Sequence, residues 1–121
     1  MTTIRAYTDI EQSKKLAEIL PIESADMCYI QDLLAGCKYG EYKPYIGNLI
    51  PAYGQDKIRC WSLASLLGVL PLVDFTTPQL IGTPKTLYRC IYNDDLKSHA
   101  YDNPVDACVD MVMRLNELNL L

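Results

Sequence analysis

The chain has 121 residues, half of them hydrophobic, which is enough to build the core of about one domain. Its net charge of −4 argues against a nucleic-acid partner, because contacts to phosphates require clustered Lys and Arg side chains. The charged fraction of 21% is slightly below the usual share of globular proteins and argues against wholesale disorder.

The N-terminal segment 1–15 contains no apolar stretch of the kind that makes a secretory signal. No segment approaches the roughly 18 continuous apolar residues that a membrane-spanning helix needs. We therefore expect a cytoplasmic protein without a membrane partner. The cysteines agree with that location, because an odd, scattered set is typical of free thiols and not of a disulfide framework: Cys28, Cys37, Cys60, Cys90 and Cys108.

The first predicted element is an amphipathic helix over residues 9–20. Thr8 and Glu11 have the spacing of a capping box, and Pro21 ends the helical pattern. Apolar residues recur at helical spacing between these two signals, with charged residues on the other faces.

Three strands are predicted between residues 22 and 61. They lie in the segments 27–30, 42–50 and 56–61, with a loop over 51–55. Four tyrosines cluster there: Tyr39, Tyr42, Tyr45 and Tyr53. Tyrosine joins a large apolar ring to a polar tip, so the cluster suits either a partner surface or ordinary packing of sheet and loop.

The segment 62–70 reads as a short helix, capped by Ser62 and ended by Pro71. It is apolar on nearly every face, which is typical of a buried helix. An exposed partner surface is the alternative, but a large apolar patch is rarely left open on a monomer. We therefore predict a central core helix next to a buried Trp61, with Gly68 allowing close packing against the sheet.

A hairpin is predicted over residues 86–101, with a turn at Asn93–Leu96. The last helix, 104–118, is the most clearly marked. Asn103 is its expected N-cap and Pro104 its first residue, and an apolar stripe runs along its length.

The hairpin register suggests one chemical possibility. Cys90 falls opposite His99, the only histidine, and opposed residues have Cβ atoms about 4.5–5.5 Å apart. A thiol beside an imidazole can become a thiolate nucleophile. The alternative is a neutral cross-strand pair. No spacing suggests a zinc site and no glycine-rich loop suggests a bound phosphate, so we assign no catalytic, cofactor-binding or metal-ligating residue and expect no cofactor.

Three segments resemble a family of small uncharacterised proteins from gut commensal bacteria and their prophages or mobile elements. The segments are DIEQSKKLAEILPIESADM, WSLASLLGVLP and YDNPVDACVDMVMRLNELNLL. The resemblance covers about half of the chain, and its most specific part is the Asn-Pro-Val-Asp-Ala opening of the last helix. It implies a bacterial or phage origin and an α+β domain, and it implies no activity and no catalytic positions.

The sequence thus predicts a single α+β domain over residues 1–121, with a small, mostly antiparallel sheet and three helices packed on it. For function we expect a non-enzymatic protein-binding or accessory protein that acts on a protein partner or as a homodimer. The alternative is a small thiol-dependent enzyme that uses the Cys90 and His99 pair. Nucleic-acid binding would become a candidate function only if the chain had a local basic face. The residues that could form one are Lys38, Lys43, Lys57 and Arg59.

Overall fold

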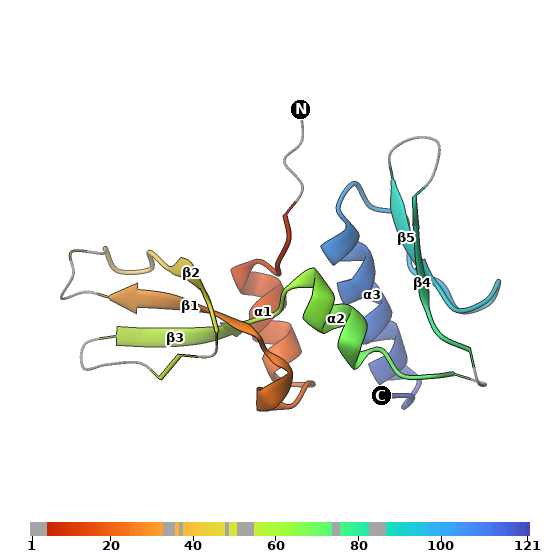
Figure 1. Cartoon of the computed structure of the whole chain (residues 1–121), viewed down its shortest axis with the longest axis horizontal. Helices are drawn as coiled ribbons and strands as arrows, with labels where there is room; N and C mark the ends of the chain where they lie inside the picture. Colours follow the sequence, from red (N-terminus) through yellow and green to blue (C-terminus); the bar gives the residue numbers. More distant parts are fainter. Residues whose placement is uncertain are drawn as a thin grey trace.

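The computed structural model describes residues 5–32, 36, 38–47, 49–50, 55–73, 76–82 and 87–121. It has the predicted α+β architecture (Figure 1). In chain order the elements are α1 (Ile10–Ala17), the 3-10 helix η1 (Ile22–Ser24), β1 (Met27–Asp32), β2 (Lys43–Ile46), β3 (Gln55–Cys60), α2 (Leu63–Val69), β4 (Gln79–Gly82), β5 (Tyr88–Ile91) and α3 (Pro104–Glu117). The three predicted helices are all present: α1 is shorter by one residue at its start and three at its end, α2 by one at each end, and α3 by one at its end.

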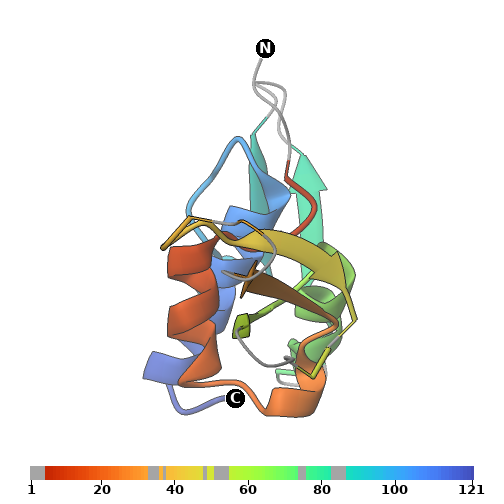
Figure 2. The same cartoon turned by 90° about the vertical axis from the view of Figure 1, so that its left-hand side faces the viewer.

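The strands form two antiparallel sheets and not the one sheet that the sequence suggested. One has the order β2-β1-β3 and the other pairs β4 with β5. The two sheets lie on opposite sides of the helices, so that α1, α2 and α3 occupy the middle of the molecule (Figure 1). In the perpendicular view, the three-stranded sheet lies in front, with α1 and α2 to either side of it (Figure 2).

The first helix is capped one residue later than predicted. Asp9 is the N-cap and accepts the Gln12 N–H, while the Gln12 side chain accepts the Asp9 N–H in return. Thr8 does not cap the helix, because its hydroxyl is buried and bonded elsewhere: it contacts Ser13 Oγ at 2.8 Å and accepts the Trp61 N–H at 3.2 Å. Thr8, which the sequence pattern favoured as the cap, is thus held by buried hydrogen bonds to Ser13 and Trp61 instead.

The predicted 86–101 hairpin is only partly formed. The main partner of β5 is β4, whereas 97–101 contacts its other edge through two isolated bridges, Ile91 with Lys97 and Tyr88 with Tyr101. Between the two bridges, β5 advances by three residues, from Tyr88 to Ile91, whereas the opposite segment advances by four, from Lys97 to Tyr101. The second segment therefore carries one extra residue, as in a β-bulge, and the register near the turn is shifted by one from the predicted register.

The core lies between the three helices and β5. Trp61 and Leu66 are fully buried, as predicted, and they pack with Leu16 of α1 and with the apolar stripe of α3. Each large side chain buried in this way contributes roughly 1.5–3 kcal/mol to stability. Asn103 caps α3 as predicted, because its side chain accepts the Val105 N–H at 2.9 Å.

The outer side of α2 differs from the expectation of a helix buried on every face. Ala64, Leu67 and Gly68 are exposed, and the element that α2 contacts most is α3. The prediction that Gly68 permits close packing is wrong, since a Cβ atom added there would meet nothing within 4 Å. Asp26 fixes the start of α2 by accepting the Ser62 N–H and hydroxyl at 2.9 and 2.5 Å. Burial raises the pKa of Asp26, but the hydrogen bonds from Ser62, Ser65 and its own backbone together outweigh burial, so the net shift of the pKa is downward.

Within the described ranges, no helix has the length and apolar character needed to cross a membrane.

Candidate functional site

The structure does not bring Cys90 and His99 together. Cys90 is fully buried and lies against Ser98: its N–H donates to Ser98 Oγ at 2.9 Å and its carbonyl accepts the Ser98 N–H at 2.8 Å. His99 is exposed, and its backbone N–H donates to Asp110 on α3 at 2.9 Å. The predicted pairing is wrong because the extra residue in 97–101 puts Ser98 in the place that His99 was expected to occupy.

The neighbour of the Cys90 thiol is instead the thiol of Cys108 on α3. Both side chains are fully buried, and the hydrogen bond between them, together with burial, raises the pKa of Cys108 far above its usual range. The same bond lowers the pKa of Cys90 although burial opposes this. The charged group that acts on the Cys90 thiol is the Asp110 carboxylate of α3, which raises the pKa of Cys90 and so disfavours the thiolate. The thiols of Cys28, Cys60, Cys90 and Cys108 are free, as predicted, and buried; Cys37 lies outside the described residues.

Alkylation of the native protein is expected to label none of these four thiols. Each has no exposed surface, so the reagent reaches a sulfur only after local or global opening. Mass spectrometry of protein treated with iodoacetamide should show full labelling in guanidinium chloride and almost none in buffer, with or without His99→Ala. Rapid labelling of Cys90 alone, abolished by His99→Ala, would contradict the structure and restore the enzyme hypothesis.

A second buried polar cluster surrounds Thr8, between α1 and β3. Besides its bonds to Ser13 and Trp61, Thr8 accepts the Tyr29 hydroxyl on its carbonyl at 2.7 Å. The Cys60 thiol lies 3.4 Å from the same carbonyl. Burial raises the pKa of Cys60, although the Thr8 and Ser13 hydroxyls lower it in part, and burial also raises the pKa of Tyr29. These groups therefore stay neutral and act as structural links.

Large apolar side chains are exposed on β2 and in the turns beside it. We call this set the β2 surface; its residues are Tyr39, Tyr45, Ile46, Leu49 and Ile50. Tyr39, Ile46 and Ile50 are 90%, 87% and 92% exposed. Two members belong to the predicted tyrosine cluster, of which Tyr42 is half-buried and bonded to Asp56 at 2.7 Å, while Tyr53 lies outside the described residues. The aliphatic members were not predicted from the sequence.

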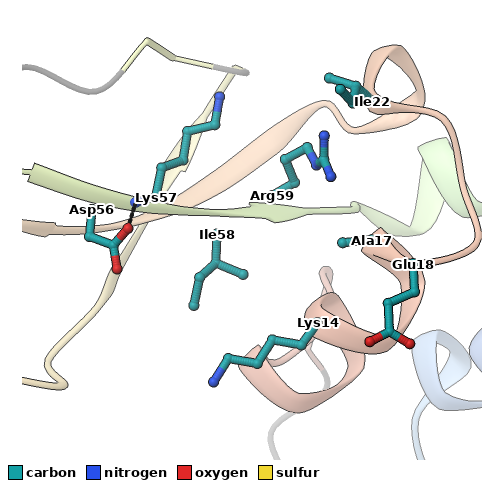
Figure 3. A pocket seen from close by; sticks show the side chains of 8 residues that line it. All are labelled: Lys14, Ala17, Glu18, Ile22, Asp56, Lys57, Ile58 and Arg59. Atoms are coloured by element: carbon teal, nitrogen blue, oxygen red, sulfur yellow. Dashed lines mark hydrogen bonds between the residues drawn. The ribbon is translucent and has the colours of Figure 1, made fainter.

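A groove of about 770 Å³ runs along the opposite edge of the same sheet, between β3, α1 and η1 (Figure 3). Its residues are Lys14, Ala17, Glu18, Ile22, Asp56, Lys57, Ile58 and Arg59. Lys57 and Arg59 point to one side of β3, whereas Ile58 points to the other side, toward Lys14 and Ala17 of α1 (Figure 3).

Three of the four residues of the predicted basic face do share one face of the sheet. Ile30 of β1 lies between Lys43 of β2 and Lys57 of β3, and Arg59 follows two residues after Lys57 on that face. Lys38 is exposed in the turn before β2. The basic face is therefore continuous with the groove.

A smaller hollow of about 420 Å³ lies between α1 and α3, but its polar groups bond to one another. Asp106 accepts from Arg5 at 2.8 Å and from the Gln12 side chain at 2.6 Å, and Arg5 also lies 3.5 Å from Asp9. This network joins the N-terminal segment, α1 and α3, and it leaves little unpaired charge for a ligand.

In the ranges that the structure covers, no group of three or more His, Cys, Asp or Glu side chains is placed to hold a metal ion. A scan against protein-family models, a search of curated proteins and a search of solved structures find no match to this chain.

Proposed function

We propose that this chain is a non-enzymatic binding or accessory protein of the bacterial or phage cytoplasm, which acts through a protein partner held on the β2 surface. The observation that carries the proposal is the exposure of three large side chains, Tyr39, Ile46 and Ile50, at 87% or more. Single exposed apolar residues are normal on a protein surface. Tyrosine is enriched at protein interfaces, and the number of large exposed apolar side chains within residues 39–50 supports an interaction site there.

The position of β2 supports the same conclusion. It is an outer strand of its sheet, and all four of its residues are exposed. The three-stranded sheet extends away from the helices, so its far end is accessible to another molecule (Figure 1). Gly47 ends the strand with a φ of 94°, which a non-glycine residue adopts only with strain, and its N–H donates to Asp26 at 2.7 Å. The turn that carries Leu49 and Ile50 is thereby attached at its start to Asp26, the residue before β1.

The thiol-enzyme alternative has less support. It required Cys90 and His99 to be in contact. Cys90 is instead buried against Ser98, and His99 is exposed with its backbone N–H bonded to Asp110. A nucleic-acid partner is also not part of the proposal, because the net charge of −4 opposes binding to phosphates.

Site-specific photocrosslinking tests the proposal. A benzophenone amino acid in place of Tyr45 should yield a discrete crosslinked protein in lysate of the cells that naturally carry the gene. The same probe at Lys97, which is exposed beyond the other sheet, serves as the control and should not yield that product. The double change Ile46→Asp and Ile50→Asp should abolish the Tyr45 product while the thermal melting curve stays unchanged.

A crosslinked species of twice the chain mass in purified protein would identify the partner as a second copy of this chain. Identical products from the Tyr45 and Lys97 probes, or no product from either, would contradict the proposal.

A further inference from the structure

We propose that the outer edge of β4 pairs, in antiparallel orientation, with the same edge of a second copy of this chain, so that two two-stranded sheets join into one of four strands. We call the outward backbone groups of Leu80 and Gly82, which form this contact, the β4 edge. It belongs to the sheet on the other side of the helices from the β2 surface (Figure 1). The inference therefore does not depend on the function proposed for that surface.

The direction of the β4 backbone groups follows from the hydrogen bonds of β5. Tyr88 exchanges backbone hydrogen bonds with Tyr101, so its N–H and carbonyl face the segment 97–101 and not β4. Successive residues of a strand direct these groups to opposite edges, and Arg89 therefore faces β4. The partner of Arg89 in the register is Ile81. Ile81 thus uses its N–H and carbonyl inside the sheet.

The two neighbours of Ile81 have the opposite orientation. Leu80 and Gly82 direct their N–H and carbonyl groups to the outer edge of β4. Neither residue makes a hydrogen bond along this edge to any part of the chain that the structure describes. Gly82 is exposed and Leu80 is half-buried, so the edge is accessible. Pro78 has no N–H to donate, and the open edge therefore begins after it.

The β4 edge lacks the devices by which native proteins protect an open strand, such as a charged side chain or a proline within it. Its strand consists of glutamine, leucine, isoleucine and glycine. The outer strand of the other sheet, β2, carries both Lys43 and Pro44. Pro44 stands at an outward position, because the Gly47 N–H, three residues later, donates inward to Asp26. Edge-to-edge pairing is thus hindered at β2 and permitted at β4.

A second copy fits this edge because the edge is complementary to itself. About a two-fold axis at Ile81, Leu80 of each copy lies opposite Gly82 of the other, and every outward N–H and carbonyl of these two residues gains a partner. The two Ile81 side chains, each 40% exposed, then lie directly opposite each other, with Cβ atoms about 4.5–5.5 Å apart. No charges of β4 oppose each other, since the strand has none.

The nearby cation of β5 does not oppose the pairing either. Arg89 lies beside Ile81 on the same face of the sheet. In the joined sheet it is three strand spacings, about 14 Å, from the Arg89 of the other copy, beyond the screening length at physiological salt.

The size of the contact determines how tightly it holds. Sheets generally need three or more strands for independent stability, so a two-stranded sheet gains from extension. A four-residue strand, however, buries less than the roughly 1,200 Å² of a stable interface. The dimer is therefore transient and forms at high protein concentration.

Disulfide trapping in the full chain tests the register. Ile81→Cys should place two thiols opposite each other across the two-fold axis, so that oxidation by copper phenanthroline gives a covalent dimer. Gln79→Cys, on the same strand and face, is the matched control. Its two thiols would be offset by four residues, roughly 13 Å, and should give less than about one-tenth as much dimer. The unchanged chain under the same oxidant measures the background from its own thiols.

Sedimentation velocity between about 10 μM and 1 mM measures the association without a crosslink. Ile81→Lys should weaken it at least tenfold, because it places like charges opposite each other. Ile46→Lys, the same change at an exposed isoleucine of β2, should leave it unchanged. Gly82→Pro removes only an outward N–H, so it should weaken the association at least tenfold without changing the thermal melting curve of the dilute protein.

A protein that stays monomeric at about 1 mM, or equal trapping of Ile81→Cys and Gln79→Cys, would overturn the inference. So would a dimer that Ile46→Lys dissociates and Ile81→Lys does not, which would place the contact on the β2 surface. Assemblies of more than two copies would overturn it as well, because a two-fold contact closes at two. The Tyr45 crosslink reports on the β2 surface alone, so the two proposals can fail separately.

Discussion

Replacement of Leu66 by aspartate is expected to leave little soluble folded protein. Leu66 is fully buried in α2 against the core that α1 and α3 complete. The change removes the burial of a large apolar side chain and places a carboxylate where the core offers only apolar contacts. Together these effects should lower the free energy of unfolding by more than about 4 kcal/mol, a large part of the total stability of a small domain. Soluble yield and thermal unfolding followed by circular dichroism measure the effect.

Leu67→Asp is the matched control, because Leu67 is the next residue of the same helix and is 38% exposed. It should change the free energy of unfolding by no more than about 1 kcal/mol. Equal yields and melting curves for the two variants would show that α2 does not belong to the core.

Thr8→Val is expected to destabilise the fold by about 1–3 kcal/mol although it preserves the volume of the side chain. The hydroxyl of Thr8 accepts the Trp61 N–H and contacts Ser13 Oγ in a fully buried position. Valine has no polar atom to offer, so a buried N–H would lose its partner. Urea denaturation followed by tryptophan fluorescence measures this, since Trp61 is the only tryptophan.

The complementary variant is Thr8→Ser, which removes a methyl group and keeps the hydroxyl. It should cost only about 1 kcal/mol, close to the value of one buried methyl group. If serine destabilised the protein more than valine, packing of the methyl group and not hydrogen bonding would be the important contribution of Thr8.

The parts of the fold that sequence predicted well are those fixed by local signals. Asn103 and Pro104 start α3, Ser62 starts α2, and each signal acts within one helical turn of its own backbone. The strand at 27–30 and the helix at 9–20 also follow from the spacing of apolar residues.

The features that sequence missed depend on contacts between distant segments. Thr8 and Asp9 are both acceptable caps for α1, and only the burial of Thr8 against Trp61 decides between them. The single extra residue opposite β5 changed the partner of Cys90, and no local pattern marks where a bulge falls. The groove beside β3 required knowledge of which strands pair, because an edge is a property of the whole sheet.

The position of α3 in the chain has a consequence for synthesis on the ribosome. It follows every other element that the structure describes and contributes more core residues than any of them, including the surface on which α2 packs. Until this helix leaves the exit tunnel, Leu16, Trp61 and Leu66 cannot be buried in a complete core. Arg5 likewise cannot form its bond with Asp106, which lies 101 residues downstream. This core can therefore form only after α3 has been synthesised, and until then the apolar segments of α1 and α2 remain exposed to chaperones.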